Sequence, residues 1–223
     1  MTFSIAGVCP ATGMVGCAIT SSSICVASRC AFTRDQVGVA LTQNVTNPLL
    51  GPMALDLMAS GMAPAAVLAQ LSEADANVEY RQLGVLASNG ESVTFSGSEA
   101  LGIHNTVSGN HCLAMGNLLA NDGIPQAMVD AFERAQGPLA ERLLTALEAG
   151  LAAGGEMGPL HSAGLQVSAN SGWPVVDLRV DWHVAPISEL RMVWQAYEPQ
   201  QQDYMTRAVT PDAAPSYGVP GDE

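Results

Sequence analysis

The stretch TFSIAGVCPATGMVGCAIT (residues 2–20) decides the fold of this chain. Residues 3–9 and 14–20 are short β-prone runs, and the PATG between them is a Pro-to-Gly turn. The sequence therefore predicts a β-hairpin that begins essentially at residue 2.

The same reading extends outward along the chain. Asn89-Gly90 lies between two apolar runs, which is a strong hairpin signal. Residues 138–152 carry leucines at helical spacing and end at Gly154-Gly155. We expect strands at 37–42, 80–87, 92–96, 163–169 and 174–180, and helices at 47–61, 64–71, 124–135, 138–152 and 187–197.

Strand pairs that are followed by helix pairs, and then by strands again, favour two antiparallel sheets over a parallel sheet with alternating helices. The predicted class is α+β, with the two sheets facing each other and helices outside them. Of the 223 residues 48% are hydrophobic, enough for one sizeable core. We expect one domain over residues 1–198 and an acidic, Pro- and Gln-rich tail over 199–223 that lacks periodicity.

The charge balance excludes several classes of function. The chain has 21 acidic residues against 8 basic ones, all of them Arg, for a net charge of -13. Such a field repels phosphate backbones and anionic lipids, so we expect neither nucleic-acid nor membrane binding. The absence of Lys excludes a phosphate-loop lysine and Schiff-base catalysis.

The chain starts without a basic leader and apolar core, and none of its apolar runs is long enough to span a membrane, so we expect a soluble, cytoplasmic protein. Its five cysteines form no CxxC pair, which argues against a disulfide framework. The four histidines lack metal-ligand spacing, and His104, His111 and Cys112 are the first candidates if zinc were bound. We predict no metal and no cofactor.

The strongest candidate for a catalytic residue is Thr2. A small residue after Met1 permits removal of the initiator methionine, which leaves Thr2 with a hydroxyl and a free α-amine. These two groups are a nucleophile and a base in one residue, since an α-amine has a pKa of about 7.7–8.0. The alternative reading of Thr2 is an ordinary start of a strand.

Several stretches together resemble one family, the domain of unknown function family 1028, which belongs with the N-terminal nucleophile (Ntn) hydrolases. They are TFSIAGVCPATGMVGCAI (2–19), LTQNVTNPLLGPMALDLMASG (41–61), EYRQLGVL (79–86), MGNLLAN (115–121), GPLAERLLTALEAGLAAGGE (137–156) and VDLRVDWH (176–183). The resemblance implies a four-layer αββα sandwich and an amide-bond hydrolase of unassigned substrate.

Two segments depart from the pattern of that family. Leu160 and His161 stand where the resemblance implies Arg and Gln, so a guanidinium for a substrate carboxylate or carbonyl is missing. GIHNTVSGNHC (102–112) replaces an expected Trp-containing loop. Both differences affect the expected wall of the substrate pocket.

Polar residues at strand ends and helix starts complete the predicted site. Asn47 through Gly51 open a helix, whose unpaired N–H groups could form an oxyanion site; the alternative is that Asn47 only caps the helix. The structural alternatives elsewhere are a polar turn at Ser21 and Ser22, an ion pair for Arg81, and turn chemistry for Asn117. The predicted catalytic residues are Thr2, Asn47 and Gly51, and the predicted substrate-binding residues are Ser21, Ser22, Thr42, Gln43, Asn44, Arg81, Gln82, Asn117 and His161.

Two hypotheses of function follow. The first is an Ntn-type hydrolase of a small amide or short peptide-like substrate, with the hydroxyl of Thr2 as nucleophile and its amine as base. The second is a non-catalytic ligand-binding or assembly module on the same scaffold, which would apply if Met1 is retained. A layered domain with much apolar surface often self-associates, so a homo-oligomer is also expected.

Overall fold

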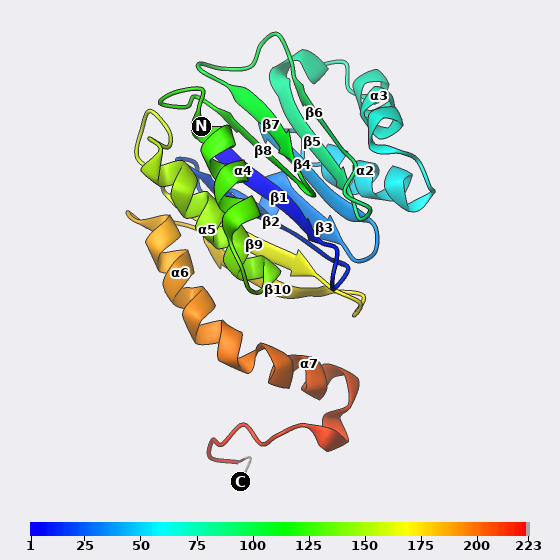
Figure 1. Cartoon of the computed structure of the whole chain (residues 1–223), viewed down its shortest axis with the longest axis vertical. Coiled ribbons are helices and arrows are strands. Elements are labelled where there is room, and N and C mark those ends of the chain that lie inside the picture. Colours follow the sequence, from blue (N-terminus) through cyan, green and yellow to red (C-terminus); the bar gives the residue numbers. More distant parts are fainter. Residues whose placement is uncertain (222–223) are drawn as a thin grey trace.

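The computed structural model describes residues 1–221 and contains two antiparallel sheets with helices around them (Figure 1). Sheet A has the strand order β10-β9-β2-β1-β8-β7, and sheet B has the order β3-β4-β5-β6. The α+β class predicted from the sequence is confirmed. The strands are β1 (Thr2–Cys9), β2 (Met14–Ser21), β3 (Ala31–Arg34), β4 (Gly38–Asn44), β5 (Arg81–Ala87), β6 (Ser92–Ser96), β7 (Asn105–Gly109), β8 (Cys112–Asn117), β9 (Ser162–Ser168) and β10 (Pro174–Val180).

The longer helices agree with the apolar spacing of the sequence within a few residues at each end. The helices of four or more residues are α1 (Ala27–Cys30), α2 (Leu50–Ala59), α3 (Pro64–Ala74), α4 (Ile124–Arg134), α5 (Leu139–Ala152), α6 (Pro186–Tyr197) and α7 (Gln201–Val209). Helix α2 begins three residues later than expected, because Asn47 and Pro48 belong to the turn before it.

Strand β1 lies near the middle of sheet A and is buried on both faces. Phe3 and Ile5 pack against α4 and α5, whereas Ala6 and Val8 share a buried cluster with β4 and β5 of the other sheet. Gly7 leaves room for the ring of Phe132, since a Cβ there would lie 2.4 Å from its Cζ. The predicted hairpin thus supplies side chains to both sides of the sheet.

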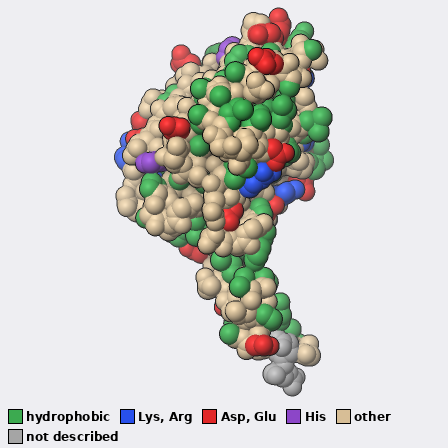
Figure 2. Space-filling model, turned by 90° about the vertical axis from the view of Figure 1, so that its right-hand side faces the viewer, with side chains coloured by type: hydrophobic (Ala, Val, Ile, Leu, Met, Phe, Trp, Pro, Cys, Tyr) green, Lys and Arg blue, Asp and Glu red, His purple; other side chains and the backbone are tan. Residues whose placement is uncertain are grey.

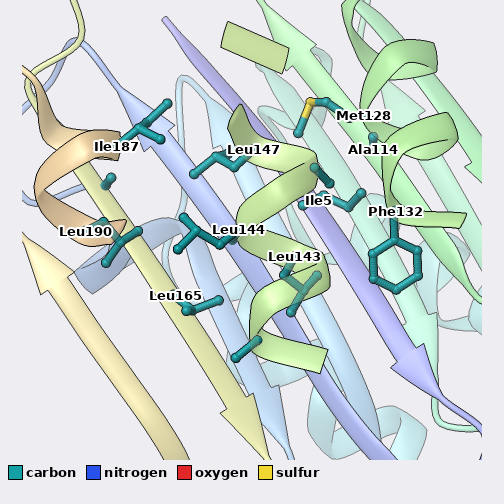
Figure 3. Packing of buried hydrophobic residues seen from close by; sticks show 14 of the residues in the cluster. Ile5, Ala114, Met128, Phe132, Leu143, Leu144, Leu147, Leu165, Ile187 and Leu190 are labelled. Atoms are coloured by element: carbon teal, nitrogen blue, oxygen red, sulfur yellow. The ribbon is translucent and has the colours of Figure 1, made fainter. Parts of the chain in front are cut away.

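Three buried clusters connect the sheets and helices. The first joins α4, α5 and α6 to sheet A, and Figure 3 shows Ile5, Leu143 and Leu144 in its centre. The second is formed by the facing sides of the two sheets, and the third joins α2 and α3 to β4 and β5. Each sheet thus has one face against helices and one face toward the other sheet. Because side chains alternate along a strand, the position of a polar residue determines which of these two faces it lies on.

Among the strands and the helices of four or more residues, five elements were not expected from the sequence: α1, β3, β7, β8 and α7. Strand β8 matters most, because it pairs with β1 and places Asn117 opposite Thr2. Its apolar run, residues 112–115, is short and is flanked by Gly and Asn, which are typical of turns. Tertiary pairing with β1 overrides this local preference.

The C-terminal segment projects from the body of the molecule (Figures 1 and 2). Within the segment expected to be a tail that lacks periodicity, residues 201–209 form α7, a helix that the sequence analysis did not predict. This segment, QQDYMTRAV, contains several good helix formers, and Tyr204 stacks on Tyr197 of α6 at 6.0 Å between ring centroids. The division into a domain over 1–198 and a tail stays a prediction.

Candidate functional site

The hydroxyl of Thr2 lies at the start of β1 and faces the space between the sheets. Strand pairing puts Thr2 opposite Ser21 of β2 on one side and opposite Asn117 of β8 on the other. Its side chain shares a face with Ala6 and Val8, which belong to the cluster between the sheets. Thr2 is 5% exposed while Met1 precedes it.

Two hydroxyl groups converge on the carbonyl oxygen of Met1. Thr2 Oγ1 donates to this oxygen at 2.5 Å, and Ser21 Oγ donates to it as well. The two hydroxyl oxygens are 3.2 Å apart. The start of β1, which we call the Thr2 corner, therefore holds an acyl oxygen between the hydroxyl of Thr2, the candidate nucleophile, and the hydroxyl of Ser21, a second donor.

A hydrogen-bond chain that ends in a cation supports the Ser21 hydroxyl. Arg29 Nη2 donates to Ser23 Oγ at 2.7 Å, and Ser23 Oγ lies 2.8 Å from Ser21 Oγ. The backbone N–H of Ser23 also donates to Ser21 Oγ, at 3.1 Å. Because successive hydrogen bonds polarise one another, this chain strengthens Ser21 as a donor.

A buried amide network lies beside β1, between the sheets. Ser4 Oγ donates to Gln43 Oε1 at 2.8 Å, and Gln43 Nε2 donates to Gln82 Oε1 at 2.7 Å. Asn117 Nδ2 donates to the same Gln82 oxygen at 3.2 Å. The structure thus brings together three residues predicted for the site, Gln43, Gln82 and Asn117.

The Oδ1 atom of Asn117 is an unused acceptor next to Thr2. It is buried, and no atom of residues 1–221 donates a hydrogen bond to it. A buried acceptor without a donor costs free energy. An amine on Thr2, the strand partner of Asn117, is a donor suited to this position.

The carboxyl of Glu156 is a site residue that the sequence analysis missed. Glu156 is 7% exposed; its Oε2 accepts the backbone N–H of Ser22 at 3.3 Å, and its Oε1 has no hydrogen-bond partner within the described part of the chain. Burial raises the pKa of this carboxyl to about 7, against the lowering effects of the Met1 amine and the hydrogen bonds from Ser22. The only sequence signal was an acidic residue directly after the Gly154-Gly155 helix end.

The raised pKa of Glu156 predicts a pH dependence of stability. Between the usual value of 4.5 and about 7, the folded chain keeps a proton that the unfolded chain has released, so stability falls as the pH rises through this range. Glu156→Gln removes this ionisation. In the form that carries Met1, we expect the variant to gain about 1–3 kcal/mol over wild type above pH 7 and nothing below about pH 4.

Melting temperatures of both proteins across a pH series measure this effect. The matched control is Glu73→Gln, because Glu73 is exposed on α3 and its substitution should change stability little at any pH. A difference between Glu156→Gln and wild type that does not grow with pH would contradict the assignment.

A cavity of about 360 Å³ adjoins Glu156, between residues 151–160 and 184–188. Gly158, Leu160 and Ile187 contribute to its wall together with Glu156. The side chain of Met1 lies beside Gly158, one of the lining residues, since a Cβ on Gly158 would be 3.0 Å from Met1 Cε. Met1, whose carbonyl oxygen accepts hydrogen bonds from the hydroxyls of Thr2 and Ser21, therefore lies next to a residue that lines the cavity.

The predicted helix-terminus oxyanion site is not at Thr2. Asn47 Nδ2 donates to Asp75 Oδ2 at 3.3 Å, and Asn47 Oδ1 accepts the N–H of Leu49 at 3.2 Å. Gly51 packs on the ring of Phe32, which a Cβ would approach to 2.1 Å. Helix α2 covers the face of sheet B that points away from β1, so sheet B separates these residues from Thr2.

Three further predicted residues are also engaged away from Thr2. Thr42 Oγ1 lies 3.1 Å from Thr46 Oγ1, on the face of β4 opposite to Gln43. Asn44 Nδ2 donates to the carbonyl of Tyr80 at 2.6 Å. Arg81 donates to Asp75 at 2.9 Å and to the carbonyl of Val45 at 2.6 Å, so it forms the structural ion pair that was its alternative reading.

Arg81→Met should therefore lower stability and leave substrate selection unchanged. The Arg81 guanidinium holds the pKa of the Asp75 carboxyl below its usual value, and both side chains are buried. Losing this pair should cost about 2 kcal/mol in the free energy of unfolding. The control is Arg34→Met, whose pair with Asp56 is 40% and 70% exposed, with an expected loss below about 1 kcal/mol.

Denaturant unfolding of the two variants tests this prediction. Equal losses would contradict the structural role of Arg81.

The last two predicted residues border the Thr2 corner. The backbone N–H of His161 donates to the carbonyl of Ser21 at 2.8 Å, and its ring stacks on Trp182 with 4.3 Å between centroids. Ser22 presents its N–H to Glu156. His161 therefore shapes the edge of the site through its backbone, and Ser22 acts on Glu156 through both its backbone N–H and its side chain.

The described residues give no sign of a metal site or of a membrane span. Over residues 1–221, no three His, Cys, Asp or Glu side chains are grouped so that they could hold a metal ion. No helix in that range is long and apolar enough to cross a membrane.

Comparisons with known proteins identify relatives of the chain. Residues 2–190 match a family of unknown function, DUF1028. A crystal structure of a Silicibacter pomeroyi protein, described by the same family, has a TM-score of 0.86 and 29% identity over 92% of this chain and 90% of that chain. Anbu (ancestral beta-subunit) from Yersinia bercovieri has a TM-score of 0.40 and 10% identity over 89% of this chain and 95% of that one, a likeness too low to carry an argument. No curated protein matches the chain.

Proposed function

This chain belongs to the DUF1028 family of unknown function, and from its own residues we propose that it is an Ntn-type hydrolase of a small amide or peptide-like substrate. The observation that carries the proposal is the meeting of the Thr2 and Ser21 hydroxyls on one acyl oxygen at the start of β1. We further propose that the two sheets and their helices form the four-layer αββα sandwich of the Ntn hydrolases.

Thr2 acts after Met1 has been removed. As the hydroxyl oxygen of Thr2 adds to the carbonyl carbon of the substrate, its proton passes to the α-amine of the same residue. The ammonium then returns a proton to the leaving nitrogen as the C–N bond breaks, which leaves an ester on Thr2. Water adds to this ester by the same route and releases a carboxylic acid.

Ser21 stabilises the oxyanion in place of Asn47 and Gly51. The carbonyl oxygen becomes negative when the tetrahedral intermediate forms, and preorganised donors at that point lower the barrier. Ser21 Oγ–H donates to it, and the chain through Ser23 to Arg29 supplies positive charge behind the donor. Asn117 Oδ1 orients the amine of Thr2 as its hydrogen-bond acceptor.

The proposed hydrolysis uses side chains, the α-amine of Thr2 and water, and needs no metal or organic cofactor. A panel of short peptide and amino-acid amides tests it with two preparations of the full chain. One preparation starts at Thr2, released by cleavage of an N-terminal fusion, and the other keeps Met1. We expect hydrolysis by the first preparation only. Equal rates in both would contradict the role of the free amine.

A non-catalytic binding module is the second candidate function. The observation that favours it is the small exposure of Thr2, which is 5% in the chain that carries Met1. A structure of the preparation that starts at Thr2 separates the candidates. The hydrolase requires a Thr2 hydroxyl open to the cavity, whereas the binding module is compatible with a sealed one.

A further inference from the structure

We propose that the site takes amides whose acyl part carries a free α-ammonium group and an apolar side chain, and that Glu156 binds this ammonium. The substrate class is thus an N-terminal aminoacyl amide or short peptide. This inference rests on the proposed function, since it names the substrate of the same site.

Met1 stands in for the acyl part of such a substrate. In the structure its acyl group is attached to the nitrogen of Thr2, whereas an acyl-enzyme would carry it on the hydroxyl oxygen of the same residue. The two positions are therefore close together. The carbonyl oxygen of Met1 already accepts hydrogen bonds from Thr2 and Ser21, as the oxygen of a bound substrate would.

The carboxyl of Glu156 is the proposed binding point for the ammonium, and the amine of Met1 lies near it without forming an ion pair with it in the described part of the chain. The positive charge of this amine acts on Glu156 and favours its ionised form. Glu156 Oε1 is buried and, throughout residues 1–221, finds no hydrogen-bond partner. Burying a carboxylate with an unbonded oxygen costs free energy unless a positive charge or a hydrogen-bond donor lies beside it. A substrate ammonium provides the charge and the donor together.

The cavity beside Glu156 accommodates the acyl side chain. It measures about 360 Å³, and Leu160, Val184 and Ile187 give it an apolar wall. The side chain of Met1 lies beside Gly158, which is one of the residues that line the cavity. The net charge of -13 also favours the approach of cationic substrates over anionic ones.

The competing partner for Glu156 is the amine of Thr2 itself. In that case the carboxylate would orient the base for every substrate and would not distinguish free from blocked amines. Binding measurements separate the two roles because they require no turnover.

Calorimetric titration of the full chain that starts at Thr2 tests the proposal, with L-methioninamide and N-acetyl-L-methioninamide as probes. We expect methioninamide to bind at least about tenfold more tightly, the usual worth of a hydrogen bond to a charged group. Glu156→Gln should abolish this preference by weakening methioninamide alone. Equal binding of the two probes, binding of neither, or a preference that survives Glu156→Gln would overturn the proposal.

Gly158→Ala is a second variant, and it does not disturb Glu156. A Cβ at this position meets only Met1 atoms, the nearest at 3.0 Å, so the fold should tolerate it. We expect methioninamide to lose about fivefold in affinity relative to glycinamide, because the added methyl crowds only the longer side chain. An unchanged ratio would contradict the placement of the acyl side chain.

Hydrolysis of the same probes separates this inference from the proposed function. If methioninamide binds through Glu156 but is never cleaved, the hydrolase fails and the binding site stands. If the acetylated amide is cleaved as well as the free one, the hydrolase stands and the role of Glu156 in selecting an ammonium is refuted.

Discussion

Thr2→Ala is expected to abolish amide hydrolysis while leaving the melting temperature nearly unchanged. The substitution removes the nucleophile but keeps a small residue at position 2, so Met1 can still be removed. The loss should be at least about 10³-fold in kcat, because the substitution removes the hydroxyl that forms the ester and lies next to the amine that serves as its base. Assays of processed wild-type and variant protein on the same amide substrate measure it.

The matched control is Thr2→Ser, which keeps both the hydroxyl and the α-amine. We expect it to retain measurable hydrolysis, and thermal unfolding of all three proteins verifies that they are folded. Activity of Thr2→Ala at the wild-type level would show that the hydrolysis comes from another group.

Ser21→Ala should have the second-largest effect. Ser21 Oγ donates to the acyl oxygen of Met1 and is itself supported by Ser23 and Arg29. Removing one donor of an oxyanion site lowers kcat by about 10²–10³-fold. The KM should change little, since the interaction strengthens mainly in the transition state. Steady-state kinetics on a cleaved amide give both constants.

Ser22→Ala is the control for this prediction. Ser22 is the next residue along the chain, but its backbone N–H and its side chain interact with Glu156, and its hydroxyl does not donate to the acyl oxygen of Met1. We expect kcat within a few-fold of wild type. Equal losses of kcat in Ser21→Ala and Ser22→Ala would contradict the role of the Ser21 hydroxyl as a donor, and would mean that the two serines affect activity only through the conformation of their loop.

The start of the sheet was predictable because its signals are local. The β-prone runs from Thr2, the turn at 10–13 and the Asn89-Gly90 pair specify strands and turns without tertiary context. Strand β8 was not predictable in this way. Its short apolar run lies among Gly and Asn residues, and only pairing with β1 makes it a strand.

The same distinction applies to the candidate site. Gln43 and Gln82 were identified because they end or interrupt apolar strands, and Asn117 because it follows Met115-Gly116. The three side chains meet in the structure. Asn47 and Gly51 were predicted because they open a helix, but the sequence did not indicate which face of sheet B that helix covers.

Arg29 and Glu156 were missed for a related reason. Arg29 follows the serine run in a four-residue helix, and Glu156 follows a helix end. Neither pattern is specific. Glu156 comes to the site through a contact with Ser22, 134 positions away. Arg29 contacts Ser23, Ile24 and Cys25, which all lie within six positions of it, but its short helix gave no sign that it would turn back toward the serine run.

The central claim is that the mature protein presents Thr2 with a free amine. The intact mass of protein produced from its own start codon, without a tag, measures this most directly. The account predicts the mass of the chain minus one methionine residue. A mass that includes Met1 would contradict it, because the nitrogen of Thr2 would then be an amide and could not accept the hydroxyl proton.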